Sequence, residues 1–160
     1  MGRALFYHLT RSTPEALAPR LIARAQGSGL RVELRGADPA MLDRLDDALW
    51  LQEGFLAHGR AGGPHDARQP VLLRVLAREA DEPGPPPNGA GCILSLDGAP
   101  VAPVRCAEAE RVLILFDGND EAALDVARGQ WRALTAGGFG ADYWSEASGG
   151  WRKERSSDGA

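Results

Sequence analysis

Residues 111–136 read RVLILFDGNDEAALDVARGQWRALTA and hold the clearest strand-to-helix unit of the sequence. The run from Arg111 to Phe116 is almost wholly apolar, which is typical of a strand covered on both faces of a sheet. Asn119 is a favoured helix-capping residue, acidic residues follow it, and Gly137-Gly138 comes directly after the helical pattern. We therefore predict a central strand that leads into a helix from about Asp120 to Ala136.

Similar units extend outward on both sides of this segment. The remaining predicted strands are Arg3–Leu9, Leu30–Leu34, Val71–Leu76, Gly91–Leu96, Ala141–Glu146 and Trp151–Glu154, and the remaining predicted helices run from Ser12-Thr13-Pro14 to about Gln26 and from Asp38-Pro39 to about Trp50. Strands that alternate with helices favour a mostly parallel sheet with helices on both faces. We predict one three-layer α/β domain over residues 1–155 and a disordered tail over residues 156–160.

Two further segments lack a strand or helix pattern. The stretch from His58 to Pro70 is rich in Gly, Pro, Asp and Arg and is predicted to be a loop. The stretch from Glu79 to Gly89, EADEPGPPPNG, combines acidic residues with a proline run. We expect this second stretch to be a mobile, solvent-facing loop inside the domain and not a domain boundary.

The composition is that of one ordinary globular domain, with 160 residues of which 44% are apolar and 25% charged. A formal net charge of −4 counts against a surface that tracks a nucleic-acid backbone, because such binding depends on neutralising phosphates with Lys and Arg. The chain has no run of about 18 apolar residues that could span a membrane, and its first residues lack a signal-peptide pattern. We therefore expect a cytoplasmic protein, with Cys92 and Cys106 as buried free thiols.

The motifs of nucleotide-binding enzymes are missing from the sequence. The first strand leads through HLTRSTPE, which has no glycine, and neither GxxxxGK[ST] nor GxGxxG occurs in the chain. Ser12 and Ser95 have no GxSxG nucleophile elbow around them. His8, His58 and His65 match no zinc pattern.

We accordingly predict no cofactor, no metal and no catalytic residue. Two alternatives stay open. One is a metal site made of His58, His65 and Asp66 in the predicted loop. The other is a small nucleotide- or metal-dependent enzyme that uses the crevice at the carboxyl edge of the sheet.

The helix predicted over residues 120–136 has two contrasting faces. Six mostly small or apolar residues at i, i+3 and i+4 spacing are predicted to pack on the sheet: Ala123, Val126, Ala127, Gln130, Ala133 and Leu134. A second stripe consists of Leu124, Arg128, Trp131, Arg132 and Thr135. Because burial against the sheet does not readily explain two arginines beside a tryptophan, we expect the second stripe to be exposed.

An exposed tryptophan flanked by arginines is a common kind of binding hot spot, since guanidinium groups bind carboxylates through paired hydrogen bonds. The ligand implied by Arg128, Trp131 and Arg132 is apolar and anionic together, such as an acidic peptide that ends in a bulky residue and a free carboxylate. In an alternative reading the arginines pair with Asp125 or face solvent while Trp131 packs under a neighbouring loop. Direct binding of single-stranded DNA by these residues is a further alternative, which the acidic net charge disfavours.

A second apolar cluster lies where the helix near Trp50 gives way to a loop. Trp50, Leu51, Phe55 and Leu56 fall within seven residues, which is a large apolar area for a turn. We interpret these residues either as part of the core or as a docking patch for a partner.

The order and spacing of five stretches resemble the chi subunit of bacterial DNA polymerase III holoenzyme: FYHL (6–9), LDRLDDALWLQEGFLAHG (42–59), CILSL (92–96), RVLILF (111–116) and ARGQWRALTAGGF (127–139). The resemblance implies a Rossmann-like α/β fold without a phosphate-binding loop, and no catalytic activity. It also implies attachment to the clamp loader through the psi subunit, and binding to the acidic, Phe-terminated tail of single-stranded DNA-binding protein. Contact with DNA would then be mainly indirect.

The resemblance assigns tail binding to Arg128, Trp131 and Arg132. Leu124 stands where the family pattern has a lysine, so part of the basic pocket is missing. We expect that Arg152 or Lys153 compensates only if the C-terminal strand lies alongside.

The resemblance also assigns a second partner surface to Trp50 and Phe55. The partner that it implies for this surface is the psi subunit or another clamp-loader component.

Overall fold

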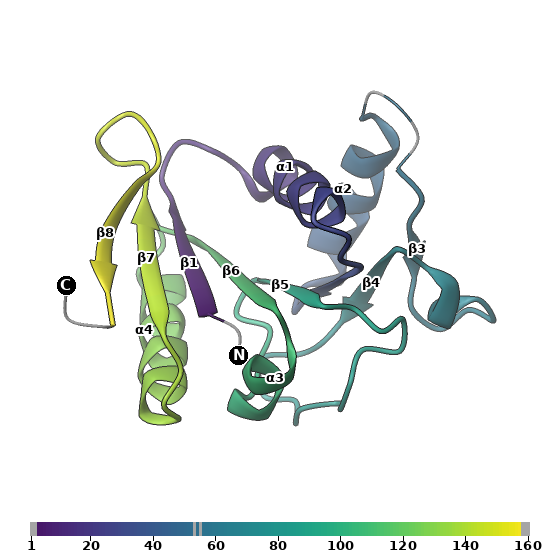
Figure 1. The fold of residues 1–160 in the computed structure, drawn as a ribbon. Coiled ribbons are helices and arrows are strands. Elements are labelled where there is room, and N and C mark those ends of the chain that lie inside the picture. Colours follow the sequence, from purple (N-terminus) through teal and green to yellow (C-terminus); the bar gives the residue numbers. More distant parts are fainter. Residues whose placement is uncertain (1–2, 53, 55, 158–160) are drawn as a thin grey trace.

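The computed structural model describes residues 3–52, 54 and 56–157, and its strands form one mixed sheet (Figure 1). In chain order the strands are β1 (Arg3–Leu9), β2 (Val32–Gly36), β3 (Gly59–Arg60), β4 (Val71–Val75), β5 (Cys92–Leu96), β6 (Arg111–Asp117), β7 (Ala141–Ser145) and β8 (Arg152–Ser156). Their spatial order is β3-β4-β2-β5-β6-β1-β7-β8. Neighbouring strands are parallel except β7 and β8, which are antiparallel.

Helices cover both faces of this sheet. Helices α1 (Pro14–Gly27) and α2 (Pro39–Trp50) lie on one face, and α3 (Pro103–Glu108) and α4 (Glu121–Ala136) lie on the other (Figure 1). Each face buries its own apolar cluster, one that includes Ile22 and Leu94 and one that includes Phe6 and Ile114. The predicted fold class is confirmed, since the chain forms a single three-layer, Rossmann-like α/β domain.

The turn into α4 differs from the prediction in one residue. Asp120, and not Asn119, caps the helix, because its side chain accepts a hydrogen bond from the Ala122 amide at 3.0 Å. Asn119 instead donates from its side chain to the carbonyl of Thr10 at 3.1 Å. Asn119 therefore ties the end of β6 to the end of β1 and does not cap the helix.

Three short elements depart from the predicted boundaries. The predicted loop from His58 to Pro70 contains β3 and a 3₁₀ turn over Asp66–Arg68, and helix α3 was not predicted. All three are shorter than two helical turns or a typical strand, so they leave no periodic pattern in the sequence. At the C-terminus β8 takes in Ser156, which we had assigned to the tail, and the Ser157 amide donates to Ala141 O at 2.8 Å.

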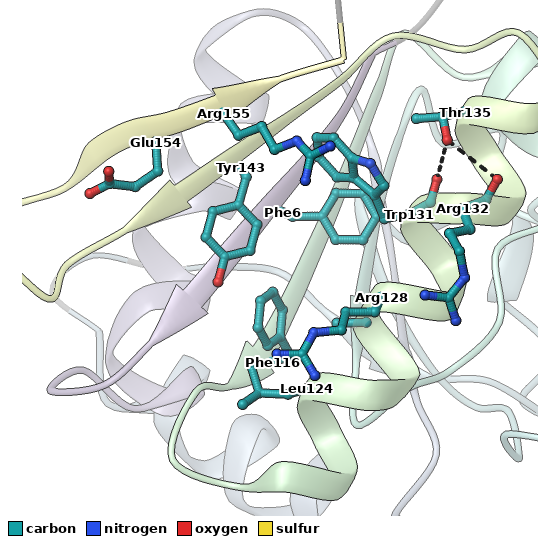
Figure 2. Close-up of a pocket in the computed structure, with 11 residues that line it drawn as sticks. Phe6, Phe116, Leu124, Arg128, Trp131, Arg132, Thr135, Tyr143, Glu154 and Arg155 are labelled. Atoms are coloured by element: carbon teal, nitrogen blue, oxygen red, sulfur yellow. Dashed lines mark hydrogen bonds between the residues drawn. The ribbon is translucent and has the colours of Figure 1, made fainter.

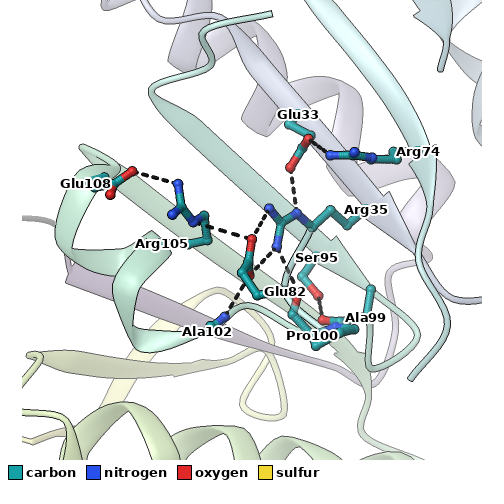
Figure 3. Close-up of polar contacts among 10 residues, drawn as sticks. All are labelled: Glu33, Arg35, Arg74, Glu82, Ser95, Ala99, Pro100, Ala102, Arg105 and Glu108. Carbon is teal, nitrogen blue, oxygen red and sulfur yellow. Dashed lines mark hydrogen bonds and ion pairs between the residues drawn. The ribbon is translucent and has the colours of Figure 1, made fainter. Parts of the chain in front are cut away.

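The segment Glu79–Gly89 is a loop inside the domain with many exposed residues, as predicted, but distant parts of the chain hold two of its side chains. Figure 3 shows the Glu82 carboxylate meeting the Arg35 guanidinium through two hydrogen bonds, each of 3.0 Å. The same carboxylate accepts from the Ala102 amide at 3.1 Å. At the far end of the segment Asn88 is buried and donates to the carbonyls of Val32 and Gln69. These contacts tie the loop to β2 at Glu82 and Asn88, which the proline run did not predict.

The reason lies in the polar residues of β2. Glu33 and Arg35 alternate with apolar residues along the strand, yet both are fully buried. Arg35 Nε lies 2.5 Å from Glu33 Oε1. Because α3 is short, the segment from Glu79 covers this part of the sheet and supplies Glu82 as the second partner of Arg35. A buried guanidinium needs such partners, since leaving it unpaired costs several kcal/mol.

Cys92 and Cys106 are buried and free, which confirms the prediction for both thiols. Burial raises the pKa of Cys92 to about 12 and that of Cys106 to about 11. Both groups therefore stay protonated and unreactive near neutral pH. In the part of the chain that the structure describes, none of the helices has the length and apolar character needed to cross a bilayer.

Candidate functional site

The predicted arginine and tryptophan stripe lines a groove of about 690 Å³ beside α4 (Figure 2). We call this feature the α4 groove. All five residues of the stripe border it, together with side chains from four strands of the sheet: Phe6, Phe116, Leu124, Ala127, Arg128, Trp131, Arg132, Thr135, Tyr143, Glu154 and Arg155. The volume lies within the range of pockets that hold small ligands or peptide side chains.

The floor of the α4 groove is aromatic. The ring of Trp131 meets that of Phe6 edge to face, with centroids 5.3 Å apart and an interplanar angle of 61°. Phe6 is buried, whereas Trp131 is half-buried. Trp131 therefore forms the boundary between the core and the groove, and its exposed part faces the space where a ligand would lie.

This packing corrects the predicted division of α4 into faces. The residues that pack on the sheet are Leu124, Ala127, Trp131 and Leu134, which follow i, i+3, i+7 and i+10 spacing. Ala133, predicted to face the core, is exposed, and Ala123, Val126 and Gln130 border a different crevice. Compared with the predicted orientation, α4 is rotated about its own axis, because the large ring of Trp131 fills the space above Phe6.

Arginines stand on two sides of the groove. On α4, Arg128 is largely exposed and its guanidinium contacts Asp125 at 3.1 Å, as one of the alternatives held. Arg132, one turn further on, is exposed. On β8 the guanidinium carbon of Arg155 lies 5.6 Å from the Trp131 ring centre, within the range of a cation–π contact.

Arg155 is one of the groove residues that the sequence did not reveal, together with Phe6, Phe116, Tyr143 and Glu154. The C-terminal strand does lie alongside, but the residue that reaches the groove is neither Arg152 nor Lys153. The register pairs Arg155 with Tyr143 and Lys153 with Trp144, with a bulge between the two pairs. Because paired residues share a face, Arg155 lies on the α4 side and Lys153 on the opposite side.

His8 lies beside the α4 groove, where it contacts two of the residues that line it. Its ring stacks on Phe116 with centroids 5.3 Å apart, and its Nδ1 shares a hydrogen bond with the hydroxyl of Tyr143. Burial raises the pKa of Tyr143. Gly118 has to be glycine here, since a Cβ would lie 1.7 Å from the His8 ring. His8 is thus a packed side chain in an aromatic cluster.

A second crevice, of about 400 Å³, lies at the carboxyl ends of β1 and β6, where the alternative enzyme reading would place its ligand. The loop after β1 presents three backbone amides there, from Thr10, Arg11 and Ser12. All three donate to one carboxylate oxygen of Glu146, at 3.0, 2.8 and 2.6 Å, and the Ser12 hydroxyl donates to the other oxygen.

Glu146 therefore occupies the position at which a nucleotide-binding fold would hold phosphate. Burial works against its charged form, but the hydrogen bonds from Ser12, Arg11 and Thr10 outweigh that cost and hold the pKa of this carboxyl below its ordinary value. An internal anion already satisfies the amides, so this crevice offers them to no external phosphate.

The other candidate catalytic groups have structural partners. Ser95 is fully buried and donates to the Ala99 carbonyl. His58 contacts Leu56 O and the Asp46 carboxylate, while Asp66 accepts from two glycine amides of its own loop. Across the described residues, no group of three or more His, Cys, Asp and Glu side chains is arranged to hold a metal ion.

The second predicted partner surface is described only in part. Trp50 is 58% exposed and Leu51 is 83% exposed, while Leu56 packs against the core. The Trp50 ring rests on the His58 ring, with centroids 4.5 Å apart. Phe55 lies outside the described residues. Trp50 and Leu51 thus form an exposed apolar patch at the end of α2.

These observations first define a class: a Rossmann-like α/β domain whose phosphate-loop position is filled from within and whose α4 groove is aromatic and arginine-rimmed. Within that class, the chain belongs to the family described as DNA polymerase III chi subunit, HolC, whose model matches residues 1–142. No curated protein matches the chain.

Membership of this family makes the chain an accessory, non-catalytic component of the DNA polymerase III complex that acts in DNA replication. A subunit of the replication machinery works in the cytoplasm, where the chromosome lies.

Proposed function

We propose that this subunit binds the acidic C-terminal tail of single-stranded DNA-binding protein in the α4 groove. It would thereby link the clamp loader of the polymerase to template coated with that protein. The single observation that carries the proposal is the groove itself, in which an aromatic floor made by Phe6 and Trp131 lies between exposed arginines.

The chemistry of the groove matches the chemistry of such a tail. A terminal phenylalanine would bury its ring against Trp131 and Phe116, where edge-to-face contacts are favourable. Its free carboxylate would accept paired hydrogen bonds from Arg128 or Arg132. Leu124 adds apolar surface to the floor of the groove. A leucine where the family pattern has a lysine therefore favours contact with the phenylalanine ring of the tail and not with its negative charges.

The proposal is tested by fluorescence anisotropy with a labelled peptide that carries the C-terminal residues of single-stranded DNA-binding protein. Arg128→Glu reverses one charge on the rim and is expected to weaken binding by about tenfold or more. Arg20→Glu makes the same charge change on an exposed position of α1, on the opposite face of the sheet, and is expected to leave binding unchanged.

The intact partner provides a second test. Pull-down of full-length single-stranded DNA-binding protein should succeed, and pull-down of a version without its C-terminal tail should fail. Equal retention of both versions, or no response of the native subunit to the peptide, would contradict the proposal.

We further propose that Trp50 and Leu51 contact a clamp-loader component, which is the psi subunit or another subunit in its place. Two large apolar side chains exposed side by side support a protein interface, because aromatic residues are enriched at the centres of such contacts. Trp50→Ser should reduce co-purification with the clamp loader while peptide binding in the α4 groove persists. Unchanged co-purification of Trp50→Ser would contradict this second proposal, whereas loss of both activities together would indicate that the variant is misfolded.

A further inference from the structure

We propose that Arg155 of β8 is a specificity residue of the α4 groove, which binds the acidic side chains that precede the terminal residue of the bound tail. This inference rests on the proposed function of the groove. It adds a second recognition element on the rim opposite α4, supplied by a strand that lies beyond the residues 1–142 matched by the family model.

The distribution of charge around the groove supports this role. Asp125 partly neutralises Arg128 through their 3.1 Å contact. Among the described residues, no carboxylate forms an ion pair of 4.0 Å or less with Arg155 or Arg132. Figure 2 shows the Arg155 guanidinium directed over Trp131, whereas the neighbouring Glu154 carboxylate points away from it. Arg155 therefore places a positive charge over the aromatic floor, while Glu154 borders the groove with its carboxylate turned away from that floor.

A cation–π contact with Trp131 orients the exposed Arg155 side chain before any ligand binds. One face of its guanidinium lies toward the Trp131 ring, which leaves its N–H edges available to carboxylates. A side chain held in its binding geometry loses less conformational entropy when the ligand arrives.

The strand that carries Arg155 is itself anchored at both ends. At one end Arg3 joins β8 to β7, since it donates to Asp142 at 2.7 Å and to the Ser156 hydroxyl at 3.1 Å. At the other end Trp151 packs edge to face on Tyr7, with ring centroids 5.3 Å apart. The β7–β8 hairpin thus places Arg155 opposite the α4 arginines as part of the folded domain.

The strand also offers a matched control. Lys153 pairs with Trp144, which packs in the apolar cluster on the opposite face of the sheet. Lys153 therefore carries the same charge on the same strand but does not face the groove. Replacing Lys153 tests the general effect of losing one positive charge from β8.

The experiment measures anisotropy with two labelled peptides of equal length that both end in phenylalanine with a free carboxylate. One peptide has aspartates before the phenylalanine and the other has asparagines. The native protein should prefer the acidic peptide. Arg155→Gln should weaken binding of the acidic peptide about tenfold, with a much smaller effect on the neutral one. Lys153→Gln should bind both peptides like the native protein.

The outcomes separate this inference from the proposed function. If the native protein binds the acidic peptide and Arg155→Gln binds it equally well, Arg155 has no role in specificity, while tail binding in the groove stands. If the native protein binds neither peptide, both proposals fail. Arg155→Lys, which keeps the charge but loses the planar stack, should recover part of the preference for the acidic peptide. All variants should unfold at the same temperature as the native protein, which establishes that they are folded.

Discussion

Phe6 of the first strand and Trp131 of α4 meet edge to face with ring centroids 5.3 Å apart, so one tryptophan belongs both to the core and to the floor of the α4 groove. This arrangement couples folding to binding. A ligand that packs on Trp131 packs on a ring whose other side is already held by a buried phenylalanine. The floor of the groove is therefore continuous with the core.

Trp131→Ala is expected to reduce both stability and tail binding. Removing a half-buried ring should lower the free energy of unfolding by about 2–4 kcal/mol, somewhat less than for a fully buried aromatic residue. Urea unfolding and peptide anisotropy measure the two effects. The control is Leu134→Ala, which removes a fully buried side chain from the same helix outside the groove. It should cost a similar amount of stability and leave peptide affinity intact; equal loss of affinity would show that Trp131 acts through stability alone.

Asp125→Asn is expected to strengthen tail binding. The Asp125 carboxylate competes with a ligand for Arg128, and the neutral amide releases that guanidinium. Because the pair is exposed, its effect is small, on the order of 0.5 kcal/mol or about a twofold gain in affinity at low salt. Peptide titrations at two salt concentrations should show the gain shrink as salt rises. Asp47→Asn, on the exposed side of α2, removes an equal charge far from the groove, and a gain of the same size there would refute a local effect.

Glu146→Gln is expected to destabilise the protein, by about 2 kcal/mol near neutral pH, because the carboxylate accepts hydrogen bonds from three amides and the Ser12 hydroxyl. Folding lowers the pKa of this carboxyl. Its contribution to stability is therefore complete above the ordinary carboxyl pKa and is lost as the pH falls through the lowered value. Urea unfolding between pH 3 and pH 7 measures this contribution.

The pH comparison has its own control. The stability difference between the native protein and Glu146→Gln should be constant at neutral pH and should shrink toward acid. Glu110→Gln, at an exposed position, should show no such difference. A Glu146 effect that is independent of pH would mean that the charge of the carboxylate contributes nothing.

The sequence predicted which residues of α4 come together but not which of them face the sheet. Periodicity placed Leu124, Arg128 and Trp131 on one stripe, and the structure brings them into one groove. The division between core and surface was right for Ala127 and Leu134, which are buried, but wrong for Ala133 and Trp131, because the helix has two partly covered sides. Which side Trp131 takes depends on Phe6, and no local pattern in α4 encodes that partner.

Arg155 escaped prediction for a different reason. A shift of one residue in a strand moves each side chain to the other face of the sheet, and the bulge in β8 introduces such a shift. The sequence of the strand, RKERS, offers several cations without a periodic apolar pattern to fix the register. The face on which each charge lies is therefore set by pairing with β7, which is visible only in the structure.

The contact between Glu82 and Arg35 was not predicted, because Arg35 lies in a strand that is distant from Glu82 in sequence. If this contact holds the segment Glu79–Gly89 in place, Glu82→Gln should loosen it. Arg35 then keeps Glu33 and the Pro100 carbonyl as partners, so the domain should stay folded and lose about 1–3 kcal/mol of stability. The sensitive measurement is limited proteolysis, in which trypsin should cleave after Arg78 faster than in the native protein.

The choice of control makes the proteolysis specific. Glu79→Gln lies in the same segment, is exposed and neutralises the same charge, so it should leave the rate of cleavage close to native apart from its direct effect next to the cleaved bond. Asn88→Ala removes the buried contacts at the far end and should accelerate cleavage as Glu82→Gln does. If neither anchor variant is cleaved faster than the native protein, the buried ion pair does not hold the segment. Its order would then come from the proline run alone, because proline restricts the backbone without any distant partner.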